Sequence, residues 1–342
     1  MVTIMELSDN DRAALHAALE RMGLGGSSAS RVFTPLIGGV SSLIVRVDTS
    51  EGCFCVKQAL SQLRVAADWH APLGRNKAEV DWIRLVSGLD SSWVPEVLGH
   101  DPVSQCFAMQ YLPLDQYPVW KGQLRDGLVD STVAEAVGSR LGQIHSATAN
   151  RPEVANQFAH EDNFYSLRLE PYFVQAGRRH PHLEPILMAL VERTNSARLA
   201  LVHGDVSPKN ILVGPRGPVF LDAECAVYGD PAFDIAFCLN HLLLKCVWRP
   251  GFHSRYLKSF LCLIDAYKPW VSWEAVDNLE QRVTEFIAAL LLARVDGKSP
   301  VEYLTDRDDQ DRVRQFAISH LQRPSTSPYD LLKDWSRTVC LP

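Results

Sequence analysis

The segment from Leu201 to Glu224 constrains the fold more than any other part of the chain. Short apolar runs typical of strands alternate there with a polar loop and with turn residues, so the order predicts strand, loop, strand, turn and strand. These parts are Leu201-Val202, His203 to Asn210, Ile211-Leu212-Val213, Gly214 to Gly217 and Val219-Phe220-Leu221.

The two later strands form an expected hairpin with Ile211 opposite Leu221. In that register Asn210 and Asp222 face each other at the open end, about 5 Å apart at Cα. A side-chain amide and a carboxylate at one place suit a hard cation such as Mg²⁺. Asp205 is expected to be free to accept a proton from an attacking hydroxyl, which completes the groups that phosphoryl transfer requires.

Each of these residues also has an ordinary structural interpretation, because Asp and Asn are common in turns and helix caps. The combination is more specific than its members. It contains a base, an Asn five residues later, a hairpin with a terminal Asp, and then the stretch Tyr228 to Ala236. Together these features predict a phosphotransferase.

The stretch from His203 to Ala236 resembles the aminoglycoside phosphotransferase and choline kinase group of small-molecule kinases. That group has the protein-kinase fold, with His-Gly-Asp where protein kinases have His-Arg-Asp. The resemblance implies that Asp205 is the catalytic base, that Asn210 and Asp222 hold Mg²⁺, and that His203 braces the loop. It also implies that Asp230 and Asp234 tie the following segment to the catalytic loop.

The sequence Asp222-Ala223-Glu224 looks more like the 5-methylthioribose kinases than the resistance enzymes, which implies that Glu224 also faces the metal. Arg294-Val295-Asp296-Gly297 is similar to an Arg-containing element near the sugar of those kinases, so Arg294 and the acids around Asp296 are candidates to line the acceptor site. Those kinases lack an Asn at position 210 and usually carry paired Arg at 293–294. The substrate is therefore not carried over.

Upstream, apolar segments alternate with turns as in a small antiparallel sheet. Gly38, Gly39 and Ser41 lie between two expected strands, where backbone N–H groups can approach phosphates. Lys57 follows Cys53-Phe54-Cys55-Val56 at the position of the ATP-binding Lys of the kinase fold, and Glu79, on a helix expected over 76–85, is its expected ion-pair partner.

The segment Met109 to Pro113 occupies the position of a kinase hinge, where backbone groups near Gln110 and Leu112 would bind the adenine edge. We therefore expect an α+β, protein-kinase-like two-lobe fold. Residues 1–111 would form a nucleotide-binding lobe with a small antiparallel sheet. Residues 112–342 would form a mostly helical lobe with the catalytic loop and substrate site.

Helical periodicity marks most of the second lobe. The expected helices cover 132–148, 158–179, 183–194, 235–248, 256–266, 272–294 and 308–321, and His145 is expected to interact with the dipole at its helix end. The tail from Pro324 to Pro342 is expected to be less regular, and 61–74 is expected to be an insertion or an extra helix.

Composition places further limits on function. The 342 residues have 34 basic and 40 acidic side chains, a net charge of −6 and no basic stripe, which argues against a nucleic-acid partner and weakly favours a cationic substrate. The eight cysteines are scattered, as expected for free thiols in a reducing cytosol. No secretory signal begins the chain, and the apolar run Phe286 to Ala293 is far short of a membrane span, so we expect a cytoplasmic protein without a membrane partner.

The sequence therefore predicts an ATP- and Mg²⁺-dependent kinase that phosphorylates a hydroxyl of a sugar, an aminoglycoside or an amino alcohol, in a metabolic role. A non-catalytic nucleotide-binding protein and a protein kinase are the alternatives. The chain has no Ala-Pro-Glu element after Asp222, which disfavours the protein kinase, and it retains Lys57, Asp205, Asn210 and Asp222, which disfavours the non-catalytic protein. Oligomeric state and the choice between ATP and GTP are not determined by the sequence.

Overall fold

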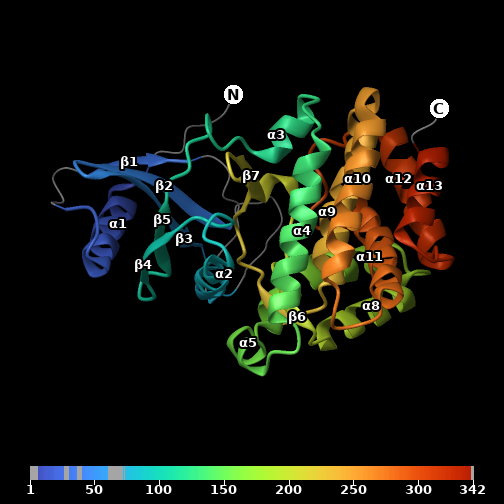
Figure 1. Ribbon diagram of the computed structural model, residues 1–342, viewed down its shortest axis with the longest axis horizontal. Helices are drawn as coiled ribbons and strands as arrows, with labels where there is room; N and C mark the ends of the chain where they lie inside the picture. Colours follow the sequence, from blue (N-terminus) through green and yellow to red (C-terminus); the bar gives the residue numbers. More distant parts are fainter. Residues whose placement is uncertain (1–6, 27–30, 37–40, 61–71, 73, 340–342) are drawn as a thin grey trace. The chain divides into compact units, whose positions relative to one another are not determined.

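The structure is a computed structural model that describes residues 7–26, 31–36, 41–60, 72 and 74–339. Gly38, Gly39 and most of the 61–74 segment lie outside these residues. The chain separates into two compact units, Met1–Gln116 and Tyr117–Pro342 (Figure 1), whereas the sequence places the boundary after Tyr111.

The first unit contains a five-stranded antiparallel sheet in the order β1-β2-β3-β5-β4. Its elements are α1 (Asp9–Met22), β1 (Val32–Pro35), β2 (Ser42–Thr49), β3 (Gly52–Ala59), α2 (Arg75–Leu89), β4 (Val97–Asp101) and β5 (Cys106–Gln110). Strand β4 is paired with β5 from Val97 to Asp101, which lies opposite Cys106.

Helices α1 and α2 pack on opposite faces of this sheet. Phe54 and Val56 share one apolar core with Leu15 and Leu19 of α1. Because side chains alternate along a strand, Lys57 points to the other face, where it contacts α2. The alternation of β3 therefore places the apolar core on the α1 side of the strand and Lys57 on the α2 side.

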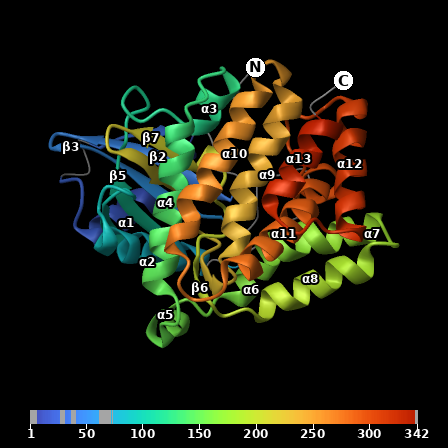
Figure 2. The same ribbon diagram turned by 45° about the vertical axis from the view of Figure 1, so that its right-hand side comes forward.

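The second unit is mostly helical, and the α+β class with a small antiparallel sheet is confirmed. Its longer helices are α4 (Ser131–Thr148), α8 (Glu184–Ser196), α9 (Ala232–Trp248), α10 (His253–Tyr267), α11 (Val276–Asp296), α12 (Arg307–Gln322) and α13 (Pro328–Thr338). Helix α10 packs against α4 and α9, and α11 packs against α9 and α12 (Figures 1 and 2). At the α4–α10 crossing a Cβ on Gly138 would lie 2.1 Å from the Leu263 carbonyl oxygen, so this close approach requires glycine.

Shorter elements connect these helices. They are α3 (Trp120–Arg125), α5 (Pro152–Gln157), α6 (Glu161–Phe164), the π-helix η2 (Tyr165–Val174), α7 (Gln175–Arg179) and the 3-10 turns η3 (Pro208–Asn210), η4 (Pro250–Phe252) and η5 (Lys268–Trp270). Strand β6 (Ala200–Val202) pairs with β9 (Val227–Gly229), and β7 (Ile211–Gly214) pairs with β8 (Gly217–Phe220).

The prediction of an irregular tail is wrong, because residues 328–338 form α13. The Ser327 side chain caps its N-terminus, Pro328 occupies the first turn, and Leu331 and Trp335 are buried at a four-residue spacing. The expected helix over 158–179 begins at Glu161 and then runs without a break to Arg179 through α6, η2 and α7, with Pro171 inside the π-helical stretch.

Candidate active site

Lys57 and Glu79 form a buried ion pair between β3 and α2. The Lys57 Nζ donates to both carboxylate oxygens of Glu79, at 2.8 and 2.6 Å. A charge-assisted contact of this kind fixes the ammonium, because the loss of either partner would leave an uncompensated buried charge. The ion pair expected from the sequence is present.

The other nucleotide-binding candidates of this unit have different surroundings. Ser41 is buried, and its carbonyl accepts from Nη2 of Arg75 at 2.7 Å. The Gln110 N–H donates to the Glu96 carbonyl at 2.8 Å, so this one donor of the expected hinge segment is used within the protein. Leu112 follows β5 and is partly exposed.

The loop after β6 is held by a carboxylate from α9. Asp234 accepts the backbone N–H of His203 at 2.7 Å and that of Gly204 at 2.8 Å. Gly204 has φ +79°, and a Cβ there would lie 2.7 Å from the Cβ of Cys225, so glycine is required. Asp234 therefore ties α9 to this loop, as the resemblance implies.

His203 braces the loop from within. The Asp205 N–H donates to its Nδ1 at 3.1 Å, so Nε2 carries the ring proton and donates to the Leu221 carbonyl at 3.1 Å. The ring is buried, and burial lowers the pKa of His203 below its ordinary value. A neutral ring with both nitrogens satisfied is a structural brace.

Asp205 is not the free carboxylate that the sequence predicts. Its Oδ2 lies 2.8 Å from Nη2 of Arg168 and 3.4 Å from Nζ of Lys209. Arg168 also donates from Nε to the Gly204 carbonyl at 2.5 Å. Burial opposes the charge of Arg168, but the negative potential of Asp205 and its neighbours outweighs it and raises the pKa of the guanidinium.

Sequence reasoning missed Arg168 because it lies in η2, where the wider turns of a π-helix do not follow the 3.6-residue period. The residue also precedes Asp205 by 37 positions, so no local motif connects them. The available signal was a single Arg among the aromatic residues Phe164, Tyr165, Tyr172 and Phe173.

The β7–β8 hairpin has a different register from the expected one. Gly214 pairs with Gly217 across a two-residue loop, which places Ile211 opposite Phe220 rather than Leu221. The prediction assumed a loop one residue longer. Asn210 therefore lies opposite Leu221, whose N–H donates to the Asn210 carbonyl at 2.9 Å, and Asp222 follows with φ +67°.

The candidate metal ligands supply oxygen donors of the kind that Mg²⁺ prefers. The Asn210 amide nitrogen donates to the Asp205 carbonyl at 3.1 Å, which leaves its Oδ1 as the possible ligand atom. Asn210 and Glu224 are buried, and Asp222 is partly exposed. The described residues contain no cluster of three or more His, Cys, Asp or Glu side chains suited to a metal, whereas this set is one amide and two carboxylates.

Asp230 does not have the role that the resemblance implies. It accepts Nε of Arg282 at 2.8 Å and Nη2 at 3.1 Å, and Arg282 in turn binds Glu274. The carboxylate also accepts the Ala232 N–H at the start of α9. Asp230 thus joins α9 to α11, and only Asp234 of this pair contacts the loop in the described contacts.

His145 contacts the Asp234 carboxylate, in addition to lying near the end of its own helix. Its Nε2 lies 3.2 Å from Oδ2 of Asp234, and its Nδ1 lies 2.8 Å from the Tyr267 hydroxyl. Burial raises the pKa of Tyr267 well above its ordinary value, so this hydroxyl stays protonated. Side chains from α4 and α10 therefore support Asp234 behind the loop.

Arg294, the candidate substrate residue, lies in the last turn of α11. Its Nη1 donates to the Tyr172 hydroxyl at 3.1 Å and to Oγ of Ser299 at 3.2 Å. Asp296, whose neighbouring acids were expected near the acceptor with Arg294, is engaged in contacts of its own. Its carboxylate binds Arg314 at 2.6 and 2.9 Å and His180 at 2.8 Å.

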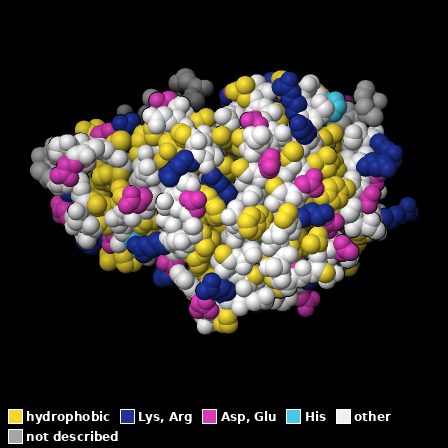
Figure 3. Space-filling view, in the orientation of Figure 1, with side chains coloured by type: hydrophobic (Ala, Val, Ile, Leu, Met, Phe, Trp, Pro, Cys, Tyr) yellow, Lys and Arg dark blue, Asp and Glu magenta, His cyan; other side chains and the backbone are white. Residues whose placement is uncertain are grey.

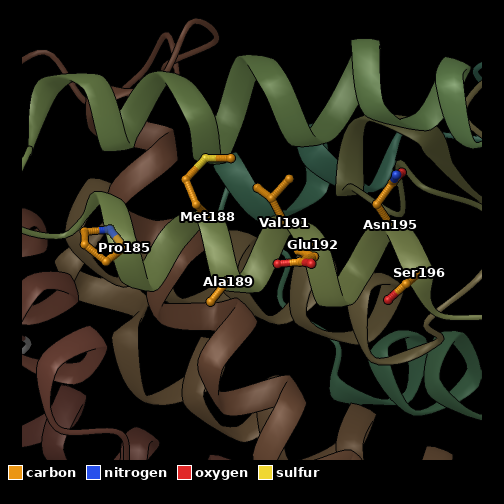
Figure 4. A pocket seen from close by; sticks show the side chains of 7 residues that line it. All are labelled: Pro185, Met188, Ala189, Val191, Glu192, Asn195 and Ser196. Atoms are coloured by element: carbon orange, nitrogen blue, oxygen red, sulfur yellow. The ribbon is translucent and has the colours of Figure 1, made fainter.

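Among the described residues, the surface shows no charged patch that marks a binding site on the face in Figure 3, where basic and acidic side chains are interspersed. An open depression along α8 contains none of the predicted site residues (Figure 4). Its lining is Pro185, Met188, Ala189, Val191, Glu192, Asn195 and Ser196. Across the described part of the chain, every helix is too short or too polar to cross a bilayer.

Comparison with known proteins identifies a family. The model of the phosphotransferase enzyme family matches residues 32–270, well over half of the chain. The methylthioribose kinase of Erwinia tasmaniensis is 27% identical over 246 residues, which are 62% of this chain and 60% of that protein. The chain thus spans less than two thirds of that relative's length.

Solved structures share the fold. An amicoumacin kinase in complex with AMP-PNP, Ca²⁺ and Ami is 15% identical with a TM-score of 0.60, over 95% of this chain and 97% of that one. A choline/ethanolamine kinase family protein from Mesorhizobium loti is 17% identical with a TM-score of 0.52, over 96% and 98%. At these identities the likeness concerns the fold.

Proposed function

We propose that this chain, which belongs to the phosphotransferase enzyme family, is a kinase that transfers the γ-phosphoryl group of ATP to a hydroxyl of a small molecule. The observation that carries the proposal is the loop from His203 to Asn210. Asp234 and His203 hold its backbone, and Arg168 holds the Asp205 carboxylate in one position. Fixing a base before the substrate arrives is how a positioned carboxylate contributes to catalysis.

Asp205 accepts the proton of the attacking hydroxyl as the oxygen–phosphorus bond forms and the bond from the γ-phosphorus to ADP breaks. Asn210, Asp222 and Glu224 would hold Mg²⁺, which neutralises charge on the β- and γ-phosphates when bound. In the first unit Lys57, fixed by Glu79, would bind the α- and β-phosphates, with Ser41, Gly38 and Gly39 near them. Leu112 would contact the adenine.

The acceptor is a sugar, an aminoglycoside or an amino alcohol, and a metabolic role is proposed over resistance. The 5-methylthioribose kinase likeness of Asp222-Ala223-Glu224 and the relative from Erwinia tasmaniensis favour a sugar. We place the protein in the cytoplasm, because the described cysteines are all free thiols, which suits a reducing compartment.

The test is ADP release from Mg-ATP with a panel of sugars, nucleoside-derived pentoses, aminoglycosides and amino alcohols. Asp205→Asn should lower kcat by about 10²- to 10⁴-fold, the usual contribution of a general base. Because this change also weakens the contact to Arg168, circular dichroism must show that the variant is folded. Asp277→Asn, at an exposed position of α11, is the matched control.

Normal turnover by folded Asp205→Asn would contradict the proposal. Mg-dependent nucleotide binding without turnover of any acceptor would favour the non-catalytic alternative.

A further inference from the structure

A group of basic side chains lies in the second unit beyond the catalytic loop. Lys245 of α9 is 1% exposed, and Arg294 of α11 is partly buried. Neither forms an ion pair with a carboxylate among the described residues, and the Lys245 ammonium has no hydrogen bond there. His241, one turn before Lys245, is buried without a hydrogen bond in the same part of the chain. We call Lys245, Arg294 and His241 the basic cluster.

Aromatic rings surround the basic cluster in place of carboxylates. The Lys245 Nζ lies 5.1 Å from the centre of the Tyr303 ring and 5.9 Å from that of Trp248, and these two rings stack at 4.4 Å. The Arg294 guanidinium lies 5.6 Å from the Tyr172 ring. Ring faces attract cations, but they do not replace an anion for a buried ammonium.

Two polar atoms beside these cations also have no hydrogen-bond partner. They are the hydroxyl of Tyr303 and Nε of Arg294, both buried. An anion with several oxygen atoms could accept from both, and from the Lys245 ammonium. The described structure thus contains donors and positive charge at one place without the acceptor that would satisfy them.

Side-chain contacts link the basic cluster to the catalytic base. Arg168, which binds Asp205, lies 5.7 Å from the Tyr172 ring and 5.6 Å from the Phe237 ring. Tyr172 accepts the hydrogen bond from Arg294, and Phe237 contacts His241 at 5.4 Å between ring centres. The cluster is therefore one layer of side chains away from Arg168, on the same unit as Asp205.

We propose that the acceptor hydroxyl is carried by a molecule with a carboxylate or phosphate group, which Lys245 and Arg294 bind while Asp205 deprotonates the hydroxyl. The proposal rests on the proposed kinase function, whose acceptor it specifies. It differs from the cationic substrate suggested by the net charge of −6, because the charge of a site is set by its own side chains.

The electrostatic surroundings of Lys245 agree with this assignment. Burial, reinforced by the positive charge of Lys121 and of Arg294, lowers the pKa of Lys245 to about 7, and Glu302 and Cys238 act in the opposite direction. His241 has its pKa lowered well below the ordinary value by burial and by the same cations. Because Glu302 also pairs with Lys121, its charge compensates the cluster only in part. A bound anion would raise the pKa of Lys245.

The first arm of the test measures binding without turnover. Inorganic phosphate is titrated at pH 6.5 and constant ionic strength while the thermal midpoint of the full chain is followed. We expect a saturable rise for the wild type, with an apparent affinity at least tenfold weaker in Lys245→Met and Lys245→Gln. Lys258→Met, at an exposed site on α10, should match the wild type. Equal curves for all four proteins overturn the proposal.

The second arm measures ADP release with ribose, ribonate and ribose 5-phosphate, which share hydroxyl groups and differ in charge. The anionic acceptors should have a kcat/KM at least tenfold above ribose, and Lys245→Met should remove that preference with the KM for ATP unchanged. Equal use of ribose, or a rise only in the KM for ATP, overturns the proposal while the kinase stands. Phosphate binding by the cluster in a protein that does not bind nucleotide would overturn the kinase assignment instead.

Discussion

Lys57 and Lys245 are both buried lysines, and they differ in what surrounds their ammonium groups. Lys57 donates to both oxygens of Glu79, whereas the Lys245 ammonium faces the rings of Tyr303 and Trp248 and has no hydrogen bond among the described residues. A buried cation with its carboxylate is complete within the folded chain. A buried cation without one is costly unless a ligand supplies the charge. Lys57 is therefore held in position by the fold itself, whereas we infer that Lys245 binds the anionic group of a ligand.

The largest expected effect comes from removing the partner of Lys57. Glu79→Ala leaves that ammonium buried as Lys245 is, and should lower the free energy of unfolding by about 3–5 kcal/mol in urea unfolding. Asp81→Asn on the same helix removes the partner of Lys77, whose side chain is 61% exposed. That control should change stability by no more than about 0.5 kcal/mol. Equal losses of stability in the two variants would contradict the claim that the buried Lys57 depends on its carboxylate partner.

Lys245→Met should raise the free energy of unfolding, which is the opposite of the effect of Glu79→Ala. The pKa of Lys245 is lowered from 10.5 to about 7 by burial, so between these pH values the unfolded chain binds more protons than the folded one. The buried Lys245 therefore lowers the free energy of unfolding of the wild type most strongly at pH 7 and below. This destabilisation decreases as the pH rises toward 10.5. Lys245→Met should be more stable by on the order of 1–4 kcal/mol at pH 6, and by less at pH 9.

Urea unfolding at those two pH values checks this prediction. A loss of stability in Lys245→Met at pH 6 would mean that an anionic group of the protein compensates Lys245.

The smallest effect is expected at Lys121, whose partner Glu302 is 66% exposed at its side chain. Lys121→Met should change the free energy of unfolding by less than about 1 kcal/mol, since exposed ion pairs contribute little. The change removes the positive charge of Lys121, which lowers the pKa of Lys245. It also releases Glu302 from its ion pair, and the negative charge of Glu302 raises the pKa of Lys245. The titration of Lys245 should therefore move to higher pH, and an unchanged titration would show that Lys121 does not act on it.

The parts of the site that short motifs encode could be predicted from the sequence. Lys57 precedes the helix of Glu79 in a recognisable order, and the spacing of Asp205, Asn210 and Asp222 follows from one loop and one hairpin. The register of that hairpin was missed by one residue, because the number of loop residues between Gly214 and Gly217 is not evident from turn composition alone.

The remaining groups could not be predicted, because long-range packing brings them together. Arg168 reaches Asp205 from a π-helix, and Lys245 is one polar residue in a helix whose residues from Ala232 to Val247 are all buried. From the sequence, a lysine in such a helix is expected to extend its ammonium to solvent. Only the fold shows that its ammonium faces the rings of Trp248 and Tyr303 and that it has no carboxylate partner among the described residues.

The most direct test is an NMR titration of the full chain carrying ¹³C-labelled lysine, with the Lys245 signal assigned by its loss in Lys245→Met. We predict a midpoint near pH 7 without added anion. In phosphate at constant ionic strength, the midpoint should move upward by at least one pH unit. A Lys245 signal that titrates above pH 9 in both conditions would contradict the account, because the ammonium would then already have its counter-charge within the protein.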